Sequence, residues 1–415
     1  MTELHELKDI EERVILLAVS TGEEEDTEAC LDELEDLVET AGAVTVDRMI
    51  QNREAVHPVT YLGKGKIQEV KERIWELDAT GVVCDDELSP AQLRSLEDAL
   101  DTKVMDRTMV ILDIFAARAS TREGKIQVEL AQLKYRAARL VGLGSSLSRL
   151  GGGIGTRGPG EKKLEMDRRL IHQRISRLKE ELKDVENHRE VQRRQRERSH
   201  IQVAAIVGYT NAGKSTLLNY LTDAGILAED KLFATLDPTT RSLTLPGGQK
   251  LLLTDTVGFI RKLPHHLIEA FKSTLEEARY SDIILHVVDC SNPHMDMQMY
   301  VVYETLRQLQ VTDKTMVTVF NKTDKPEHQE ILKDLSADHQ VKLSAKTGQG
   351  VDQLLRVLET VLRERQICLE RLYPYSQAGK IQSVRKYGVL LEEEYREDGI
   401  FIRAYVPAEL YGQVL

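Results

Sequence analysis

The chain has 415 residues, of which 30% are charged and 5% aromatic, and its formal net charge is −12. It contains no apolar run near the roughly 20 residues of a membrane span, and its acidic N-terminus lacks the apolar core of a signal peptide, so we expect a cytoplasmic protein. Its four cysteines are scattered without a C-x-x-C pair, which argues against a disulfide framework or a zinc site.

The first part of the chain predicts an α/β domain, which we place at residues 1–120. Short apolar runs alternate here with helical periodicity, as is typical of a largely parallel sheet. Ser89 is a candidate N-cap, with Pro90 in the first turn of the helix that it begins. Strands are predicted at 14–20, 43–50, 81–86 and 103–106.

Residues 121–199 predict a long antiparallel helical hairpin. Two series of apolar residues step by 4, 3, 4, 3, which is coiled-coil spacing, on otherwise charged helices. The series are Ile126, Leu130, Leu133, Ala137 and Leu140, and Ile171, Ile175, Leu178, Leu182 and Val185. Two such seams close in sequence fold most simply against each other. Dimerisation through the seams is the alternative, but a hairpin would use them, so a monomer is expected.

The hairpin segment is basic although the whole chain is acidic. Residues 1–40 hold 15 Asp/Glu against 2 Lys/Arg, whereas residues 121–199 hold 20 Lys/Arg against 11 Asp/Glu. At its centre, residues 142–160 contain eight glycines, Arg149, Arg157 and no acidic residue. Glycine permits close approach to phosphates and the helices supply counter-charge, so this stretch predicts an RNA-binding tip loop; a plain linker is the alternative.

Residues 200–366 predict a P-loop nucleotide-binding domain with a mostly parallel sheet and helices on both faces. G-x-x-x-x-G-K-S follows a predicted strand and precedes a helix, the context that a phosphate loop requires. Lys214 would neutralise the β/γ-phosphate charge and Ser215 would ligate Mg²⁺. The loop consists of Gly208, Tyr209, Thr210, Asn211, Ala212, Gly213, Lys214 and Ser215.

Three further motifs follow at strand ends and identify the nucleotide as GTP. D-x-x-G would place Asp255 near Mg²⁺ and the Gly258 N–H on the γ-phosphate. In N-K-x-D, Asp324 would accept two guanine hydrogen bonds, a pattern that adenine cannot match. L-S-A-K would bring the Ala345 N–H to guanine O6. The motif residues are Asp255, Thr256, Val257 and Gly258; Asn321, Lys322, Thr323 and Asp324, of which the first two brace the loop and pack over the base; and Ser344, Ala345 and Lys346.

Two features of the switch regions remain open from the residues alone. The stretch 232–243 offers three candidate threonines for Mg²⁺ and the γ-phosphate: Thr235, Thr239 and Thr240. Phe259 stands where other GTPases carry a water-orienting glutamine. A phenyl ring cannot orient water, so the enzyme should be slow until a partner completes the site. Packing of Phe259 against the following helix is the compatible structural interpretation.

Residues 367–415 predict a small C-terminal α+β domain, in which alternation over 399–406 indicates a strand. No recognisable chemistry lies in this part of the sequence.

With these motifs in view, the sequence resembles the HflX family of ribosome-associated GTPases over nearly its full length. The similarity is most specific in GYTNAGKST, FATLDPTTR, DTVGFIRKLP, NKTD and SRLGGGIGTRGPGEKKLEMDRR. It implies binding to the large ribosomal subunit, with the glycine-rich loop reaching ribosomal RNA, and a role in ribosome splitting, rescue or assembly. It also implies Thr235 as the switch threonine and second Mg²⁺ ligand, in a segment of Phe233, Ala234, Thr235, Leu236 and Asp237.

Asn211 has two interpretations: in some related GTPases an asparagine here helps to hold K⁺ beside the phosphates, and otherwise it braces the loop. At the level of function, the residues favour a ribosome-triggered GTPase over two alternatives. An ATP-binding RNA remodeller would need a second phosphate loop, and none is visible before residue 200. A scaffold whose hairpin binds a protein partner would not need the basic loop.

Overall fold

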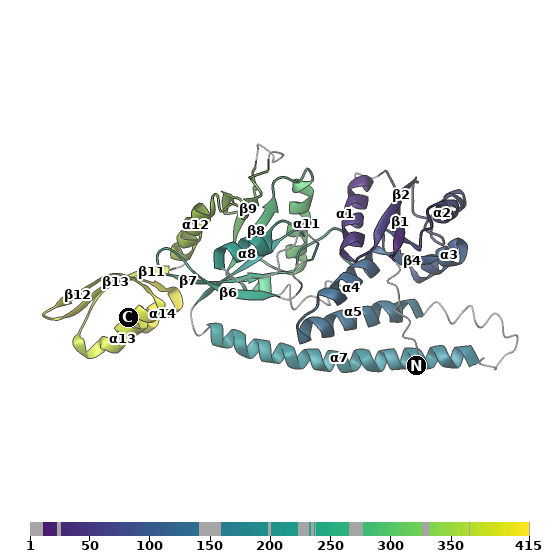
Figure 1. The fold of residues 1–415 in the computed structure, drawn as a ribbon. Coiled ribbons are helices and arrows are strands. Elements are labelled where there is room, and N and C mark those ends of the chain that lie inside the picture. Colours follow the sequence, from purple (N-terminus) through teal and green to yellow (C-terminus); the bar gives the residue numbers. More distant parts are fainter. Residues whose placement is uncertain are drawn as a thin grey trace, which may run out of the picture. The chain divides into compact units, whose positions relative to one another are not determined.

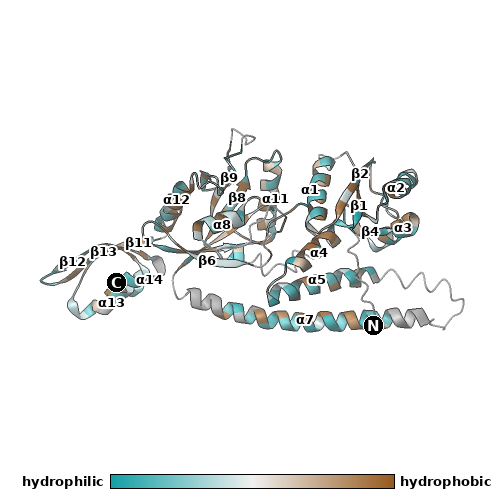
Figure 2. Ribbon diagram, in the orientation of Figure 1, coloured by the Kyte–Doolittle hydropathy of each residue, from teal (hydrophilic) through white to brown (hydrophobic). Residues whose placement is uncertain are grey.

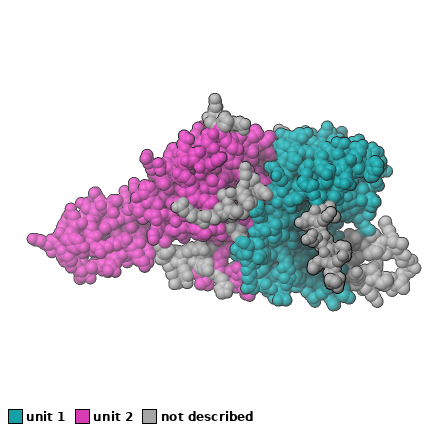
Figure 3. Space-filling view, in the orientation of Figure 1, with its two compact units in different colours: residues 1–183, 262–270 teal, residues 184–261, 271–415 magenta. Residues whose placement is uncertain are grey.

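The computed structural model describes residues 11–22, 26–140, 159–197, 201–222, 232–233, 236, 238–264, 277–325, 332–364 and 366–414. The chain divides into two compact units (Figure 3), and each is described by itself. Unit 1 comprises residues 1–183 and 262–270, and unit 2 comprises residues 184–261 and 271–415. Among the described residues, no helix is long and apolar enough to cross a membrane.

Unit 1 begins with a four-stranded parallel sheet in the order β2-β1-β3-β4 (Figure 1). Its helices lie on both faces, with α1 and α4 packed together on one and α2 and α3 on the other. The elements are β1 (Arg13–Ser20), α1 (Thr27–Thr40), β2 (Val44–Asn52), α2 (Lys64–Leu77), β3 (Gly81–Cys84), α3 (Pro90–Leu100), β4 (Lys103–Asp106) and α4 (Arg107–Arg118).

The sequence prediction of this sheet was confirmed in its strands, with two differences. Ser89 caps α3 in a full capping box with Gln92, as its position before Pro90 suggested. The predicted strand at 81–86 was too long by two residues, because β3 pairs with β4 only as far as Cys84 and Asp106. Asp85 and Asp86 therefore lie in the loop at the carboxyl edge of the sheet. The helix α4 is an element that was not predicted from the sequence.

The helical hairpin is formed by α5 (Arg122–Leu140) and α7 (Pro159–Glu197). Ile126, Leu130, Ile175 and Leu178 are buried between the two helices, with other members of both predicted seams packed against them. The helices run in opposite directions, since Glu129 pairs with Arg174 and the earlier Arg122 pairs with the later Glu181. In Figure 2 the helix α7 is mostly hydrophilic with isolated apolar patches, as expected of a narrow seam.

Unit 2 contains a six-stranded sheet in the order β10-β9-β8-β5-β7-β6 (Figure 1), in which only β6 runs antiparallel. The mostly parallel sheet predicted for this part of the chain is confirmed, and β6 is an edge strand that was not predicted and begins within the switch stretch 232–243. The elements are β5 (Gln202–Gly208), α8 (Lys214–Thr222), β6 (Thr239–Thr244), β7 (Lys250–Asp255), β8 (Ile283–Asp289), α11 (Met295–Gln308), β9 (Thr315–Asn321), β10 (His339–Lys342) and α12 (Val351–Glu364).

The end of unit 2 is a three-stranded antiparallel sheet in the order β11-β13-β12 with two helices. Its own core includes Leu369, Tyr373, Ile381, Ile402 and Val406. The strand predicted at 399–406 is β13. The elements are β11 (Gln366–Tyr373), the 3-10 turn η2 (Tyr375–Gln377), α13 (Ala378–Tyr387), β12 (Val389–Arg396), β13 (Gly399–Pro407) and α14 (Ala408–Val414).

Candidate functional site: a nucleotide site at the carboxyl edge of the sheet

The predicted phosphate loop connects β5 to α8. Parallel strands end at one edge of a sheet, so the loops after β5, β7, β9 and β10 meet there. Gly213 has φ +94°, and a Cβ at this position would lie 2.2 Å from Nδ2 of Asn321. Only glycine fits both the left-handed backbone and this close approach. The loop thus presents its backbone N–H groups and the start of α8 to an anion.

Lys214 is buried at the first position of α8. Its Nζ donates to the carbonyl oxygens of Gly208, at 3.2 Å, and Tyr209, at 2.7 Å. Burial, the largest influence, and the nearby Lys322 together lower the pKa of Lys214 to about 8, although the charge of Asp255 opposes them. A triphosphate beside this amine would favour its charged form, so Lys214 is placed to bind phosphate as the sequence predicted.

Ser215 and Asp255 form the part of the site suited to Mg²⁺. The Ser215 hydroxyl donates to Oδ2 of Asp255 at 2.8 Å, and Asp255 is fully buried at the end of β7. A hydroxyl and a carboxylate oxygen are hard ligands of the kind that Mg²⁺ prefers. These residues fit the ion, which would neutralise charge on the β- and γ-phosphates when bound.

The third motif packs tightly against the phosphate loop. Thr256 donates to the carbonyl of Ile206 at 2.7 Å, and Val257 is buried. At Gly258 a Cβ would lie 2.8 Å from Cγ2 and 2.9 Å from Cα of Thr210. Gly258 can therefore bring its N–H to a γ-phosphate only because it lacks a side chain.

Phe259 is fixed both by its backbone and by burial of its ring. Its N–H donates to the Gly208 carbonyl at 3.1 Å, and its carbonyl accepts from the Thr210 N–H at 2.8 Å. The residue is 1% exposed, so its ring packs in the interior and reaches no water beside a phosphate. The helix that Phe259 was expected to pack against falls mostly in 265–276, outside the described residues.

Asn321 joins the base-reading loops to the phosphate loop. Its Nδ2 donates to the Ala212 carbonyl at 2.9 Å, and its Oδ1 accepts from the Ala345 N–H at 2.9 Å. Ser344 is fully buried and its hydroxyl hydrogen bond, the largest influence, lowers the pKa of Asp324. Asp324 itself is exposed and ionised, as a carboxylate that accepts from guanine must be.

Asp289 also belongs to the site, although it was not predicted from the sequence. Nζ of Lys322 lies 2.8 Å from Oδ2 of Asp289 at the end of β8. This ion pair holds the lysine that was expected to cover the base. Its signal in the sequence is an acidic residue at the end of the mainly apolar run IILHVVD. Thr323 donates to the Leu343 carbonyl at 3.4 Å, and Lys346 is exposed.

The switch threonines are only partly described. Thr239 and Thr240 lie in β6, where the Thr240 and Thr254 hydroxyls are 2.9 Å apart. Phe233 and Leu236 are buried. The predicted residues Ala234, Thr235 and Asp237 lie outside the described residues, as do residues 142–158 of the glycine-rich loop. The predicted loop was too long at its end, because residues 159 and 160 belong to α7.

Comparisons with known proteins agree with this geometry. Residues 28–116 match the family model "GTP-binding GTPase N-terminal", 118–196 match "GTP-binding GTPase Middle Region", and 203–322 match "50S ribosome-binding GTPase". The chain is 77% identical to the GTPase HflX of Lacrimispora saccharolytica, over 100% of this chain and 98% of that protein. It is 48% identical to the GTPase HflX of Caldanaerobacter subterraneus subsp. tengcongensis, over 98% and 94% of the two chains.

A solved structure of a GTP-binding protein from Sulfolobus solfataricus, in complex with GDP, is 23% identical. It matches 84% of this chain and 98% of its own, with a TM-score of 0.44.

Proposed function

Because the chain belongs to the HflX family of GTPases, we propose that it is a GTP-driven switch acting on the large ribosomal subunit. GTP hydrolysis is the activity of the family, and the G domain matches a 50S ribosome-binding GTPase model. The proposal extends to the outcome, which is splitting or rescue of stalled ribosomes or assistance in subunit assembly. We also propose that it acts in the cytoplasm, because its proposed partner is the ribosome.

The observation that carries the switch proposal is the buried Phe259. Its ring is 1% exposed and its backbone is bonded to the phosphate loop, so no side chain at this position orients the attacking water. In-line attack on the γ-phosphate would rely on Lys214, the Gly258 N–H and backbone amides for charge stabilisation. An enzyme of this kind is slow alone and gains rate when a partner supplies the missing group.

The proposed ribosomal contact is the hairpin and its loop at 142–160. The support is chemical: eight glycines, Arg149 and Arg157 occur without an acidic residue, between two helices rich in Lys and Arg. We propose that this loop contacts ribosomal RNA phosphates and that the protein acts as a monomer, because the apolar seams of α5 and α7 are used within the hairpin.

The metal and domain assignments belong to the same proposal. We place Mg²⁺ on Ser215 and Thr235, and K⁺ beside Asn211, which is exposed and has φ +59°. The proposed domains are 1–120, 121–199, 200–366 and 367–415.

The test is hydrolysis of GTP and ATP with and without purified large ribosomal subunits. We expect the subunits to stimulate GTP hydrolysis by at least tenfold and to leave ATP hydrolysis at background, because Asp324 selects guanine. Deletion of 151–158 serves as the matched variant: stimulation should disappear while GTP affinity stays unchanged. Equal GTP hydrolysis rates with and without subunits would refute the proposal.

A further inference from the structure

A cavity of unit 2 lies at the edge of the six-stranded sheet that is opposite to the GTP site. Gln202 and Lys250, the first residues of β5 and β7, line this cavity, whereas the GTP site is built on the carboxyl ends of the same strands. Most of the remaining wall comes from the β6–β7 turn, the end of α13 and the beginnings of β11 and β12. The volume is about 570 Å³, within the range of small-ligand pockets.

The charged side chains of this cavity are all basic. Lys250, Arg385 and Lys386 line it, and none of its described lining residues is acidic. Arg385 pairs with Glu393, but Lys250 and Lys386 form no ion pair with any carboxylate in the described part of the chain. Nζ of Lys386 lies 4.9 Å from the centre of the Tyr387 ring. Two ammonium groups without a counter-charge beside a concave surface favour an anionic ligand.

The neutral polar side chains of the cavity are glutamine amides, which both donate and accept hydrogen bonds. Nε2 of Gln249 donates to Oε1 of Gln366 at 2.9 Å, so this pair links the β6–β7 turn to β11. Oε1 of Gln202 is buried and accepts a hydrogen bond from none of the described residues. A buried acceptor without a partner is destabilising, and a ligand that donates an N–H or O–H group would satisfy it.

The β6–β7 turn, residues 245–249, is held in place before any ligand binds. The Gly247 N–H donates to the Glu359 carboxylate of α12, and Gln249 is bonded to β11. Gly248 has φ +83°, a left-handed backbone that favours glycine. The turn therefore presents Lys250 to the cavity from a fixed backbone, which lowers the entropy lost on binding.

We propose that this cavity binds a nucleoside phosphate, either as a free nucleotide or as a nucleotide of single-stranded RNA. The phosphate contacts Lys250 and Lys386, and the glutamine amides bind the edge of the base. The Tyr387 ring offers a surface on which a base can stack. Phosphate alone would leave the Gln202 acceptor without a donor, and an uncharged nucleoside would leave the lysines without an anion, so both halves of the ligand are needed.

The test measures the binding of 5′-AMP and of a pentaadenylate RNA to the full chain by isothermal titration calorimetry. Mg²⁺ and GDP are present in excess to occupy the GTP site, and adenine is chosen because a glutamine amide matches its edge. Adenosine and inorganic phosphate are the two half-ligands. Each should bind at least about tenfold more weakly than 5′-AMP, because each loses one set of hydrogen bonds.

The RNA measurement is repeated on a chain without residues 151–158, which removes the loop proposed to contact ribosomal RNA. Tighter binding of the RNA than of 5′-AMP to that chain assigns the site to RNA. Equal or weaker binding of the RNA assigns the site to a free nucleotide. The deletion itself should leave the affinity for 5′-AMP unchanged.

Substitutions in the cavity wall locate the binding. Lys250→Ala and Lys386→Ala should each weaken 5′-AMP binding about fivefold, the upper end for exposed charge pairs. Lys380→Ala is the matched control, since Lys380 lies in α13 with Lys386 but does not line the cavity. Gln202→Met should also weaken binding about fivefold. Its stability should be equal or higher, because the variant removes a buried acceptor that has no described partner.

Absence of binding by both 5′-AMP and the RNA would overturn the proposal, as would unchanged 5′-AMP affinity in the two lysine variants. Lower stability of Gln202→Met with unchanged 5′-AMP affinity would give the amide a structural role and would also overturn it. If Gln202→Met fails to fold, the variants of the two exposed lysines decide the outcome. None of these measurements uses ribosomes or GTP hydrolysis, so this site and the proposed function can fail separately.

Discussion

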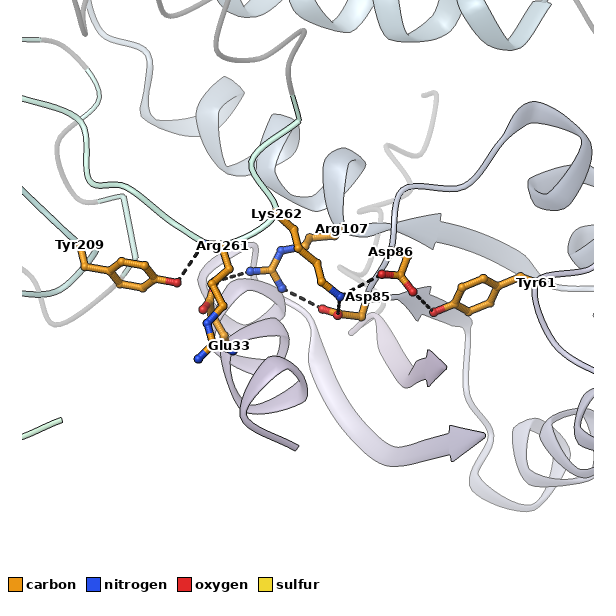
Figure 4. Close-up of polar contacts among 8 residues, drawn as sticks. All are labelled: Glu33, Tyr61, Asp85, Asp86, Arg107, Tyr209, Arg261 and Lys262. Atoms are coloured by element: carbon orange, nitrogen blue, oxygen red, sulfur yellow. Dashed lines mark hydrogen bonds and ion pairs between the residues drawn. The ribbon is translucent and has the colours of Figure 1, made fainter. Parts of the chain in front are cut away.

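Two polar clusters of this protein lie at carboxyl edges of parallel sheets, but their residues are distributed differently along the chain. The nucleotide site is built from four short motifs, each contiguous in sequence and each at a strand end. The cluster around Asp85 and its neighbour Asp86 draws single residues from distant positions, namely Glu33, Tyr61, Arg107 and Lys262 (Figure 4). A site that binds its ligand through backbone groups requires several consecutive residues of the right type. A charge cluster requires only that the fold bring single side chains together from distant positions. Sequence motifs therefore identify the nucleotide site but not the cluster around Asp85.

The largest expected effect of a single substitution is on the nucleotide site, at the carboxylate of Asp324 that binds the guanine base. Asp324→Asn should lower GTP affinity on the order of 10³- to 10⁴-fold, because the amide no longer accepts both hydrogen bonds of guanine. Xanthosine triphosphate, which presents an acceptor where guanine has an amino group, should bind the variant better than GTP. The measurement is competition binding with the two nucleotides. Unchanged preference for GTP would mean that Asp324 does not read the base.

The next largest effect is on the stability of unit 1, through the cluster around Asp85. Arg107→Met should destabilise unit 1 by at most about 3–5 kcal/mol, because Asp85 loses its buried guanidinium partner and keeps only the Lys262 ammonium. Native-state hydrogen exchange of the β3 amides, Val82 and Val83, reports this directly. Arg73→Met removes the exposed pairs with Asp47 and Glu76 and is the control, with far smaller change expected. Equal exchange in both variants would show that burial of Arg107 has no energetic consequence.

The smallest predicted effect is a pH dependence beside the nucleotide site. His286 is 1% exposed in β8, with Asp334 at 4.0 Å and the Tyr303 ring in edge contact. Burial, with a smaller contribution from Lys214, lowers the pKa of His286 to about 4 despite the opposing charge of Asp334. The unfolded chain then takes up the proton first, so stability falls between about pH 6.5 and 4, by roughly 2 kcal/mol at pH 5.

Denaturant unfolding of unit 2 at pH 7 and pH 5 measures this loss, and His286→Gln is the matched variant. The variant should be less stable at pH 7 but should lose roughly 2 kcal/mol less on acidification. A variant with the same pH dependence as the original protein would assign the acid sensitivity to other groups.

The sequence predicted most of the fold because its signals are local. Apolar runs that alternate with helical stretches predicted the parallel strands. The spacing of the apolar residues alone predicted the seams of α5 and α7. The errors have local causes as well. β6 escaped notice because Thr239 and Thr240 were considered as metal ligands rather than as an edge strand, and 81–86 was extended over two aspartates that pairing leaves outside β3.

The site was less completely predictable. The residues of the phosphate loop and of the base-binding loops were predicted from motifs. The side chains that hold those residues in place were not. Asp289 positions Lys322 from a neighbouring strand, and Lys262 lies in DTVGFIRKLP, a stretch that indicated the family but gave no sign of the carboxylates that this lysine contacts. Such contacts depend on which strands become neighbours, and that is a property of topology rather than of any window of residues.

Asn321 has a consequence for how the nucleotide is read. One amide side chain holds the Ala212 carbonyl of the phosphate loop with its nitrogen and the Ala345 N–H of a base-reading loop with its oxygen. The loop that binds the phosphates and a loop that binds the base are thus joined by the hydrogen bonds of the Asn321 side chain. A nucleoside in the base pocket would therefore help to order the loop that awaits the phosphates. Guanosine and inorganic phosphate should accordingly bind with positive cooperativity, as two fragments of one ligand.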